Sequence, residues 1–170
     1  MQNILFLCTG NTARSILAEA ILAQDGAGRF AAFSAGSQPK GVVNPFAIHV
    51  LARHGYATGG LRSKSWDEFA APGAPVMDYI FTVCDNAAGE ACPLWLGHPT
   101  SAHWGIADPA AVEGSEEDRI AAFEAAFAQM HARITAFLAL PLDDMQPADV
   151  LAALQNIGRM VGASMNQRHA

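Results

Sequence analysis

The stretch ILFLCTGNTARS, residues 4–15, joins an apolar run that ends at Cys8 to five small or polar residues and then Arg14. A short continuous apolar run is typical of a buried strand, and apolar residues at helical spacing over 16–21 predict a helix after the loop. A tight loop between a strand and a helix directs backbone N–H groups and the positive end of the helix dipole to one place. The stretch therefore predicts a cradle for a tetrahedral oxyanion, with a thiol at its base.

Each residue of this loop has an expected part in the cradle. Gly10 permits backbone geometry that would strain a larger residue, and Arg14 can form planar, bidentate hydrogen bonds with an anion. The same positive field should lower the pKa of Cys8 and make it nucleophilic, with Ser15 placed to donate a hydrogen bond to the thiolate. The expected oxyanion-binding residues are Thr9, Gly10, Asn11, Thr12, Ala13 and Arg14. The alternative is that Cys8 is a core thiol, since free cysteine is often fully buried.

Length, charge and cysteine count restrict the classes of protein. A chain of 170 residues predicts one domain with a sizeable core. No apolar run approaches a membrane span and residues 1–8 lack the basic start of a signal peptide, so we expect a cytoplasmic protein with no membrane partner. A net charge of −6 without a basic cluster argues against nucleic acid as a partner. Three cysteines, Cys8, Cys84 and Cys92, favour reactive or metal-bound thiols over structural disulfides.

Apolar runs and helical patterns alternate along the chain. Strands are predicted at residues 3–8, 29–35, 79–84 and 101–106. Helices are predicted at residues 14–24, after the Asn44–Pro45 pair, and after a capping box formed by Ser115 and Asp118. Strands separated by helices imply a parallel sheet with right-handed crossovers. We therefore expect an α/β fold, a three-layer sandwich around a four-stranded parallel sheet.

Three motifs follow one another along the chain: CTGNTARS at residues 8–15, CDNAAGEAC at 84–92 and HWGIADPA at 103–110. The first resembles the phosphate loop of the low-molecular-weight protein tyrosine phosphatase superfamily, and implies its phosphotyrosine phosphatase I fold. Together the three resemble the arsenate reductases built on that fold, the kind coupled to thioredoxin. The resemblance covers roughly residues 3–139, and three motifs in this order are a specific signal.

The resemblance implies a role for each motif. Cys8 would be the nucleophile, residues 8–14 the oxyanion loop, Asp108 the general acid, and Cys84 with Cys92 a redox pair. The residues support this arrangement independently. In a parallel sheet, sites form at the carboxyl ends of the strands, where Cys8, Cys84 and Asp108 are all expected.

Simpler interpretations remain for the same residues. Asp108 precedes Pro109 and could merely form a turn, and Cys84 could be a core thiol at a strand end. Cys84 and Cys92 could also bind zinc together with His98 and His103. Their uneven spacing and the lack of a CxxC pair argue against zinc, so we expect no such metal.

The extra cysteines favour reduction over hydrolysis. Reducing arsenate to arsenite needs two electrons, which Cys8, Cys84 and Cys92 can supply through successive disulfides. Thioredoxin, or a glutaredoxin-type system, would then regenerate the thiols, and no cofactor is expected. The first alternative is a low-molecular-weight protein tyrosine phosphatase that hydrolyses phosphomonoesters with Cys8, Arg14 and Asp108. A second alternative is a non-catalytic redox sensor or oxyanion-binding module.

The resemblance also implies a monovalent-cation site behind the loop in some members. The matching positions are Asn11, Glu19, Ser34 and Asp67. Their oxygen atoms would suit potassium or sodium better than a transition metal. Asn11 could instead only pin the loop, and Glu19 could be a solvated helix residue.

The last part of the chain lies beyond the resemblance. Residues 1–140 are expected to form the catalytic domain and residues 141–170 a helical extension of the same domain. Pro147 could open a helix there, with one apolar stripe. The stripe would comprise Val150, Leu154, Ile157 and Val161. Such a stripe most often packs on its own domain, although it could also form a dimer interface.

Overall fold

A four-stranded sheet forms the centre of the computed structural model, which describes residues 1–90, 93 and 95–164. All strands are parallel, in the order β2-β1-β3-β4. They are β1 (Gln2–Cys8), β2 (Phe30–Gly36), β3 (Tyr79–Thr82) and β4 (Thr100–His103). The predicted sheet is confirmed, although β3 and β4 end earlier than the sequence suggested.

The register of the strands decides which residues share the functional edge. Cys8 is aligned with Gly36, Leu7 with Thr82, and Thr82 with His103. The carboxyl ends of all four strands therefore lie along one edge, where parallel sheets form their sites.

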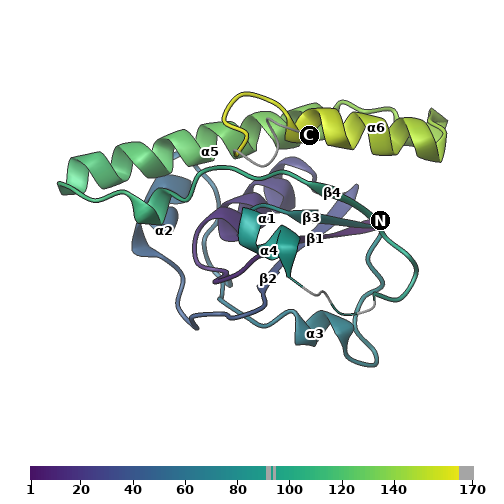
Figure 1. The fold of residues 1–170 in the computed structure, drawn as a ribbon, viewed down its shortest axis with the longest axis horizontal. Helices are drawn as coiled ribbons and strands as arrows, with labels where there is room; N and C mark the ends of the chain where they lie inside the picture. The colour runs from purple at the N-terminus through teal and green to yellow at the C-terminus, as the bar shows by residue number, and fades with distance from the viewer. Residues whose placement is uncertain (91–92, 94, 165–170) are drawn as a thin grey trace.

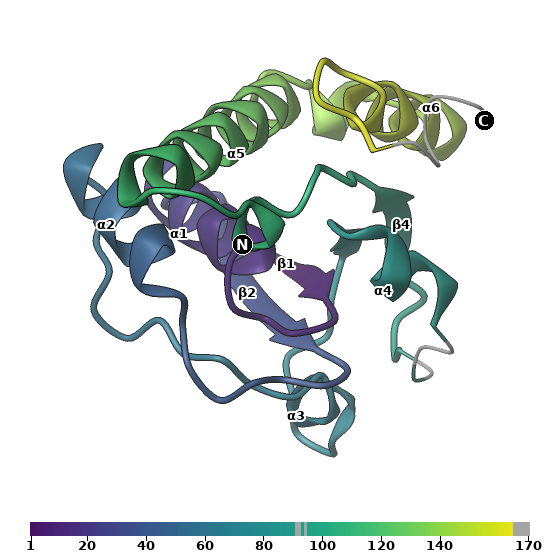
Figure 2. The same ribbon diagram turned by 60° about the vertical axis from the view of Figure 1, so that its left-hand side comes forward.

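Helices cover the two faces of the sheet unequally (Figures 1 and 2). One face carries α1 (Arg14–Asp25), α2 (Pro45–Arg53), α5 (Glu116–Leu138) and α6 (Pro147–Gly158). The other face carries the short α3 (Asp67–Ala70), and α4 (Asp85–Gly89) follows β3 at the carboxyl edge. Two short 3-10 turns lie at Pro109–Ala111 and Leu142–Asp144. The arrangement agrees with the expected three layers.

The central strand β1 is buried on both faces. Ile4 and Phe6 belong to the larger core beneath the four helices, while Leu5 and Leu7 belong to a smaller core in which Phe69 of α3 packs. Successive side chains of a strand point to opposite faces. A strand covered on both sides consequently reads as a continuous apolar run, which is how residues 3–8 read in the sequence.

Two helix starts follow the predicted capping chemistry. The Asn44 side chain accepts a 2.9 Å hydrogen bond from the Phe46 N–H at the start of α2. The Ser115 hydroxyl accepts from the Asp118 N–H, and the Asp118 carboxylate accepts from the Ser115 N–H, both at 3.1 Å. These reciprocal bonds satisfy N–H groups that have no partner within the helix. Both predicted helix starts are confirmed.

Helix α6 packs against the β4 side of the sheet. The indole N–H of Trp104 donates a 2.9 Å hydrogen bond to the carbonyl of Leu154. The Trp104 ring stacks on Phe81 of β3 at a centroid distance of 3.9 Å. Trp104 and Leu154 are both fully buried. The apolar side of α6 is therefore covered by the chain's own sheet.

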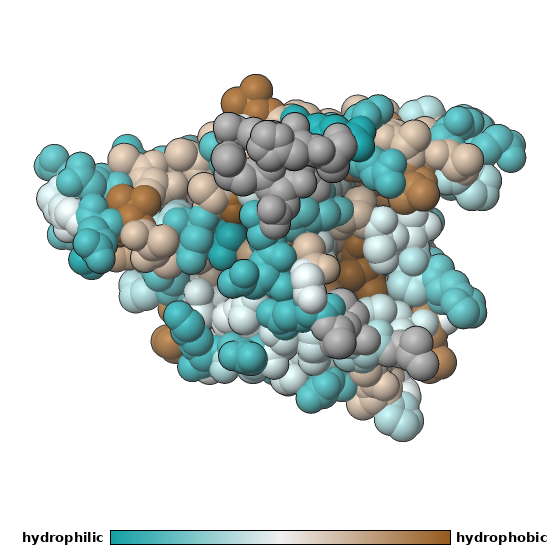
Figure 3. Space-filling view, in the orientation of Figure 1, coloured by the Kyte–Doolittle hydropathy of each residue, from teal (hydrophilic) through white to brown (hydrophobic). Residues whose placement is uncertain are grey.

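The predicted apolar stripe ends where the helix ends. Val150, Leu154 and Ile157 are buried, whereas Val161 is 91% exposed because α6 stops at Gly158. Figure 3 shows hydrophilic and apolar residues interspersed on one face of the molecule, with apolar surface visible in the hollow beneath α6. No helix in the described part of the chain is both long and apolar enough to cross a membrane.

A buried arginine holds the chain that follows α6. The guanidinium of Arg133 donates hydrogen bonds to the carbonyls of Met160 at 3.1 Å and Val161 at 3.2 Å. The chain then returns to the sheet edge, where the Ser164 N–H donates to the Gly105 carbonyl at 3.0 Å. The C-terminal segment thereby reaches the functional edge.

Two leucines of α6 test this packing. Leu154 is 0% exposed and Leu151 is 38% exposed. Leu154→Ala should lower the free energy of unfolding by about 2–5 kcal/mol, because it removes buried methyl groups and leaves a cavity. Leu151→Ala is the matched control and should cost less than about 1 kcal/mol. Urea denaturation measures both, and equal small effects would show that α6 does not pack on this sheet.

Candidate active site

Three carbonyl groups anchor the loop between β1 and α1 to a neighbouring segment of the chain. The carbonyls of Thr9, Gly10 and Thr12 accept hydrogen bonds of 3.0, 3.1 and 2.9 Å from backbone N–H groups of the segment 38–44. In a trans peptide the N–H points opposite to the carbonyl. The N–H groups that follow these carbonyls are therefore turned inward, over the base of the loop at Cys8.

A cavity of about 230 Å³ lies inside this loop. Its lining includes every loop residue from Cys8 to Arg14 except Asn11, together with Gln38, Lys40, Cys84, Asn86 and Asp108. Inward N–H groups, the start of α1 and a guanidinium make it a site for an anion. The sequence analysis predicted that the loop and Arg14 form the anion site. It did not predict Gln38 and Lys40, which belong to the segment that is hydrogen-bonded to the loop.

Gly36 allows β2 to pass directly against the loop. A Cβ atom at this position would lie 2.4 Å from the Thr9 carbonyl oxygen and 2.8 Å from that of Cys8. Real Cβ atoms do not approach backbone so closely. Any side chain here would push the loop away from the sheet.

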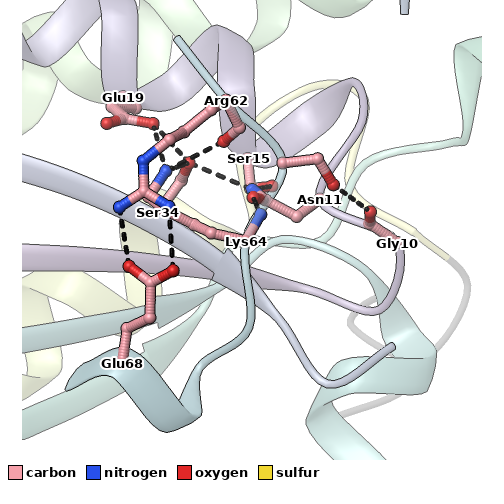
Figure 4. A network of polar contacts seen from close by, with 9 residues as sticks. Gly10, Asn11, Ser15, Glu19, Ser34, Arg62, Lys64 and Glu68 are labelled. Atoms are coloured by element: carbon pink, nitrogen blue, oxygen red, sulfur yellow. Dashed lines mark hydrogen bonds and ion pairs between the residues drawn. The ribbon is translucent and has the colours of Figure 1, made fainter. Parts of the chain in front are cut away.

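Asn11 fixes the loop from within. Its φ is 47°, in the left-handed region that asparagine adopts more readily than most residues. Its side-chain N–H2 donates to the hydroxyls of Ser15 at 2.8 Å and Ser34 at 3.0 Å, and its carbonyl oxygen accepts from the Lys64 N–H at 2.9 Å (Figure 4). The structure thus pairs Ser15 with Asn11, whereas the sequence suggested a bond from Ser15 to the Cys8 thiolate.

Cys84 lies beside Cys8, as the strand order implied. The Cys84 sulfur accepts hydrogen bonds from the N–H groups of Thr9 at 3.3 Å and Ala87 at 3.4 Å. The second bond makes Cys84 the N-cap of α4. Both cysteines are buried, and their side chains share a hydrogen bond.

The hydrogen bond between the two thiols shifts their pKa values in opposite directions. The hydrogen bond from the Cys8 thiol, helped by the two backbone N–H groups, lowers the pKa of Cys84 to about 5. The same hydrogen bond and burial raise the pKa of Cys8, and Arg14 only partly opposes the rise. The sequence predicted a lowered pKa for Cys8. The structure differs because the Cys8 thiol is buried and donates its hydrogen bond to Cys84.

Arg14 and Asp108 face each other at the mouth of the cavity. A guanidinium nitrogen of Arg14 lies 3.6 Å from the Asp108 carboxylate, and the other donates to the Ile106 carbonyl at 3.0 Å. Asp108 also accepts a 3.0 Å hydrogen bond from the Ala110 N–H, so it does form the turn that the sequence allowed. Turn formation and a position beside the anion site therefore coexist.

A series of hydrogen-bonded side chains joins the ends of β3 and β4 to the C-terminal segment, and the sequence analysis, which named His103 only as a possible zinc ligand, did not predict it. His103 contacts the Thr82 hydroxyl at 2.6 Å and the Asp85 carboxylate at 2.8 Å. The Ser164 hydroxyl donates to the same carboxylate at 2.5 Å. In the sequence, His103 lies 18 positions and Ser164 79 positions from Asp85, and the fold brings them together where the sheet edge and the C-terminal segment meet. No local signal could have identified them.

The expected cation-site residues are only partly brought together. Glu19 and Ser34 lie around the Lys64 ammonium, at 3.4 Å from its nitrogen in each case, and Asn11 is bonded to Ser34. Asp67 is exposed at the start of α3. Cys92 lies outside the described residues, and so does any pairing that involves it.

Comparison with known proteins agrees with this geometry. Residues 3–150 match the family described as low molecular weight phosphotyrosine protein phosphatase. The chain belongs to this family. It is 35% identical over 126 residues to an arsenate reductase of Bacillus subtilis, which covers 73% of this chain and 87% of the relative. The expected resemblance to arsenate reductases is therefore confirmed.

Solved structures show the same fold. An arsenate reductase in the phosphate-binding state superimposes with a TM-score of 0.62 at 23% identity, covering 82% of this chain and 98% of that one. A low molecular weight protein tyrosine phosphatase from T. tengcongensis gives 0.65 at 20% identity, covering 81% and 98%. The relatives thus include both kinds of enzyme on one fold.

The low pKa of Cys84 can be measured directly. In a Cys92→Ser background, the ultraviolet absorbance of thiolate should show one equivalent that is present at neutral pH and is lost as the pH falls through about 5. Cys84→Ser should remove this transition. Cys8→Ala should move it to higher pH, because the hydrogen bond that stabilises the thiolate is lost. A transition that survives Cys84→Ser would place the charge on Cys8 instead.

Proposed function

We propose that this chain is an arsenate reductase that binds arsenate in the loop of residues 8–14 and reduces it with cysteine thiols. The supporting observation is the hydrogen-bonded pair of Cys8 and Cys84 at the base of the anion site. Hydrolysis of a phosphomonoester needs one nucleophilic thiol, a guanidinium and an acid. Hydrolysis does not require a second thiol in contact with the first, whereas a two-electron reduction does.

The first step would be attack of the Cys8 sulfur on arsenic. Cys8 gives its proton to the Cys84 thiolate with which it shares a hydrogen bond, so the nucleophile is generated where it is needed. Asp108 protonates the oxygen that departs as water, and Arg14 with the inward N–H groups balances the negative charge of the oxyanion. The product is a Cys8 sulfur–arsenic(V) adduct.

The second step would reduce the arsenic. The Cys84 sulfur, after losing its proton, attacks the Cys8 sulfur, and the electron pair of the sulfur–arsenic bond passes to arsenic, which leaves as arsenite. A Cys8–Cys84 disulfide remains, so two thiols have supplied the two electrons. Cys92 then attacks Cys84, releases Cys8 and forms a Cys84–Cys92 disulfide, which a dithiol protein such as thioredoxin would reduce.

Loss of the helix cap would help the last transfer. In the reduced structure, Cys84 caps α4, a helix of only five residues that ends at Gly89. Oxidation of Cys84 removes the thiolate that accepts the Ala87 N–H, and a lost cap costs about 1 kcal/mol of helix stability. Helical geometry over eight residues would separate the Cys84 and Cys92 Cα atoms by roughly 12 Å, too far for a disulfide. Loosening α4 would therefore favour the approach of Cys92.

Phosphomonoester hydrolysis is the second candidate function. The facing Arg14 and Asp108 side chains, 3.6 Å apart, offer the anion clamp and the acid that hydrolysis needs. Two assays separate the candidates. Arsenate-dependent oxidation of NADPH in the presence of thioredoxin and its reductase supports reduction, with a glutaredoxin system as the alternative donor. Turnover of an aryl phosphate without any reductant, and none of arsenate, would replace the proposal by hydrolysis.

Substitution of the two paired cysteines should separate the steps. Cys8→Ser should abolish arsenate reduction and any hydrolysis of aryl phosphate, because both begin at that sulfur. Cys84→Ser should abolish arsenite release but keep a measurable part of any aryl phosphate hydrolysis. Arsenite production and nitrophenol release measure the two activities. Near-normal arsenite production by either variant contradicts the mechanism.

Removal of Cys92 should stop the cycle after one turnover. With reduced Cys92→Ser, we expect one equivalent of arsenite per chain and then a trapped Cys8–Cys84 disulfide. Rapid-quench quantification of arsenite and mass spectrometry of the peptides test both expectations. Undiminished steady-state turnover with thioredoxin would show that Cys92 takes no part in the relay.

A further inference from the structure

A lysine ammonium is buried behind the anion loop. The Lys64 side chain is 6% exposed, and its nitrogen donates to the Arg62 carbonyl at 3.0 Å. The Ser34 hydroxyl and the Glu19 carboxylate each lie 3.4 Å from the same nitrogen (Figure 4). Lysine is almost never buried to this extent without partners. Here a carbonyl, a hydroxyl and a carboxylate surround it, and Glu19 supplies the opposite charge.

The same lysine is built into the support of the loop. Its backbone N–H donates to the Asn11 side chain at 2.9 Å, and its carbonyl accepts from the Gly36 N–H at 2.9 Å. Ser34 receives the second hydrogen bond of Asn11 at 3.0 Å and donates in turn to Glu19. Asn11 is therefore tied to Lys64 twice, once directly and once through Ser34.

A free monovalent cation does not fit this arrangement. Three oxygen donors that would suit potassium or sodium, on Glu19, Ser34 and Arg62, already face the ammonium of Lys64. Asp67, the fourth residue that the resemblance implied, is exposed and lies outside the cluster. A second positive charge beside a buried ammonium would be strongly unfavourable.

We propose that Lys64 is a resident cation that positions the oxyanion loop through Ser34 and Asn11, so that oxyanion binding by this chain is independent of potassium and sodium. The proposal rests on the proposed function only in taking residues 8–14 as the anion site. Lys64 does not touch the anion. It neutralises Glu19 and keeps the Ser34 hydroxyl in place for Asn11, whose left-handed backbone shapes the loop.

Two substitutions distinguish a charge requirement from a packing requirement. Lys64→Ala removes the ammonium and leaves room for an ion, whereas Lys64→Met removes the charge but keeps a side chain in the space. Both should bind phosphate more weakly than the wild type by several-fold. Arg62→Met is the matched control, because it also removes one positive charge, two residues away, from a side chain that is exposed and paired with Glu68. It should bind phosphate as the wild type does.

Potassium should rescue only the variant with room for it. Titration calorimetry on the reduced protein measures phosphate affinity, and thermal melting measures stability. Both are compared in potassium chloride and in choline chloride of equal ionic strength. We expect no difference for the wild type, recovery of Lys64→Ala in potassium, and none for Lys64→Met. Lys64→Ala that folds only in potassium also supports the proposal. If Lys64→Ala folds in neither salt, the phosphate affinities of Lys64→Met and of the wild type in the two salts test the proposal.

Three results would overturn the proposal. They are potassium dependence of the wild type, wild-type phosphate affinity in both Lys64 variants, or equal rescue of Lys64→Ala and Lys64→Met. Because phosphate binding needs no turnover, these results are independent of arsenate reduction. A chain that binds phosphate as expected but never reduces arsenate would refute the proposed function and leave the role of Lys64 intact.

Discussion

The orientation of three peptide groups in the loop after β1 is the constraint on which the site depends. Their carbonyls are bonded outward to the segment 38–44, so their N–H groups must face the cavity. No charged residue is needed for this part of the anion site, because the backbone supplies the donors. Arg14 then adds charge at the mouth of the loop, and Cys8 lies at its base. The absence of a side chain at Gly36 allows the loop to lie directly against the sheet.

The hydrogen bond between Cys8 and Cys84 is the second feature of this anion site, since it lowers the pKa of one thiol and raises that of the other. The register of β1 and β3 brings Cys84 next to the loop, and the Thr9 N–H is directed at its sulfur. The Cys84 thiol therefore has a lowered pKa, and the Cys8 thiol that donates to it has a raised one.

Local sequence predicted the parts of the fold that depend on local physics. The strand–loop–helix unit, the Asn44 cap and the Ser115 capping box each involve residues a few positions apart, and all are found. The misses are long-range. Lys64 reaches Glu19 across 45 positions, and Ser164 reaches Asp85 across 79. The charge on Cys84 also depends on a hydrogen bond between segments 75 residues apart, so no spacing rule could have assigned it.

The fold supports hydrolysis and reduction with the same anion site, and the surroundings of that site make the difference. Hydrolysis of a phosphomonoester would need an anion loop, a guanidinium and an acid, and the loop, Arg14 and Asp108 offer these groups. Reduction additionally needs a second sulfur close enough to attack the first, on a segment that can then move away. Cys84 is hydrogen-bonded to Cys8, as the first condition demands, and it caps a helix of only five residues, which bears on the second. A short helix depends strongly on its cap, since few internal hydrogen bonds stabilise it. Oxidation of the Cys84 sulfur to a disulfide would thus also alter the N-cap of α4, the helix that follows it.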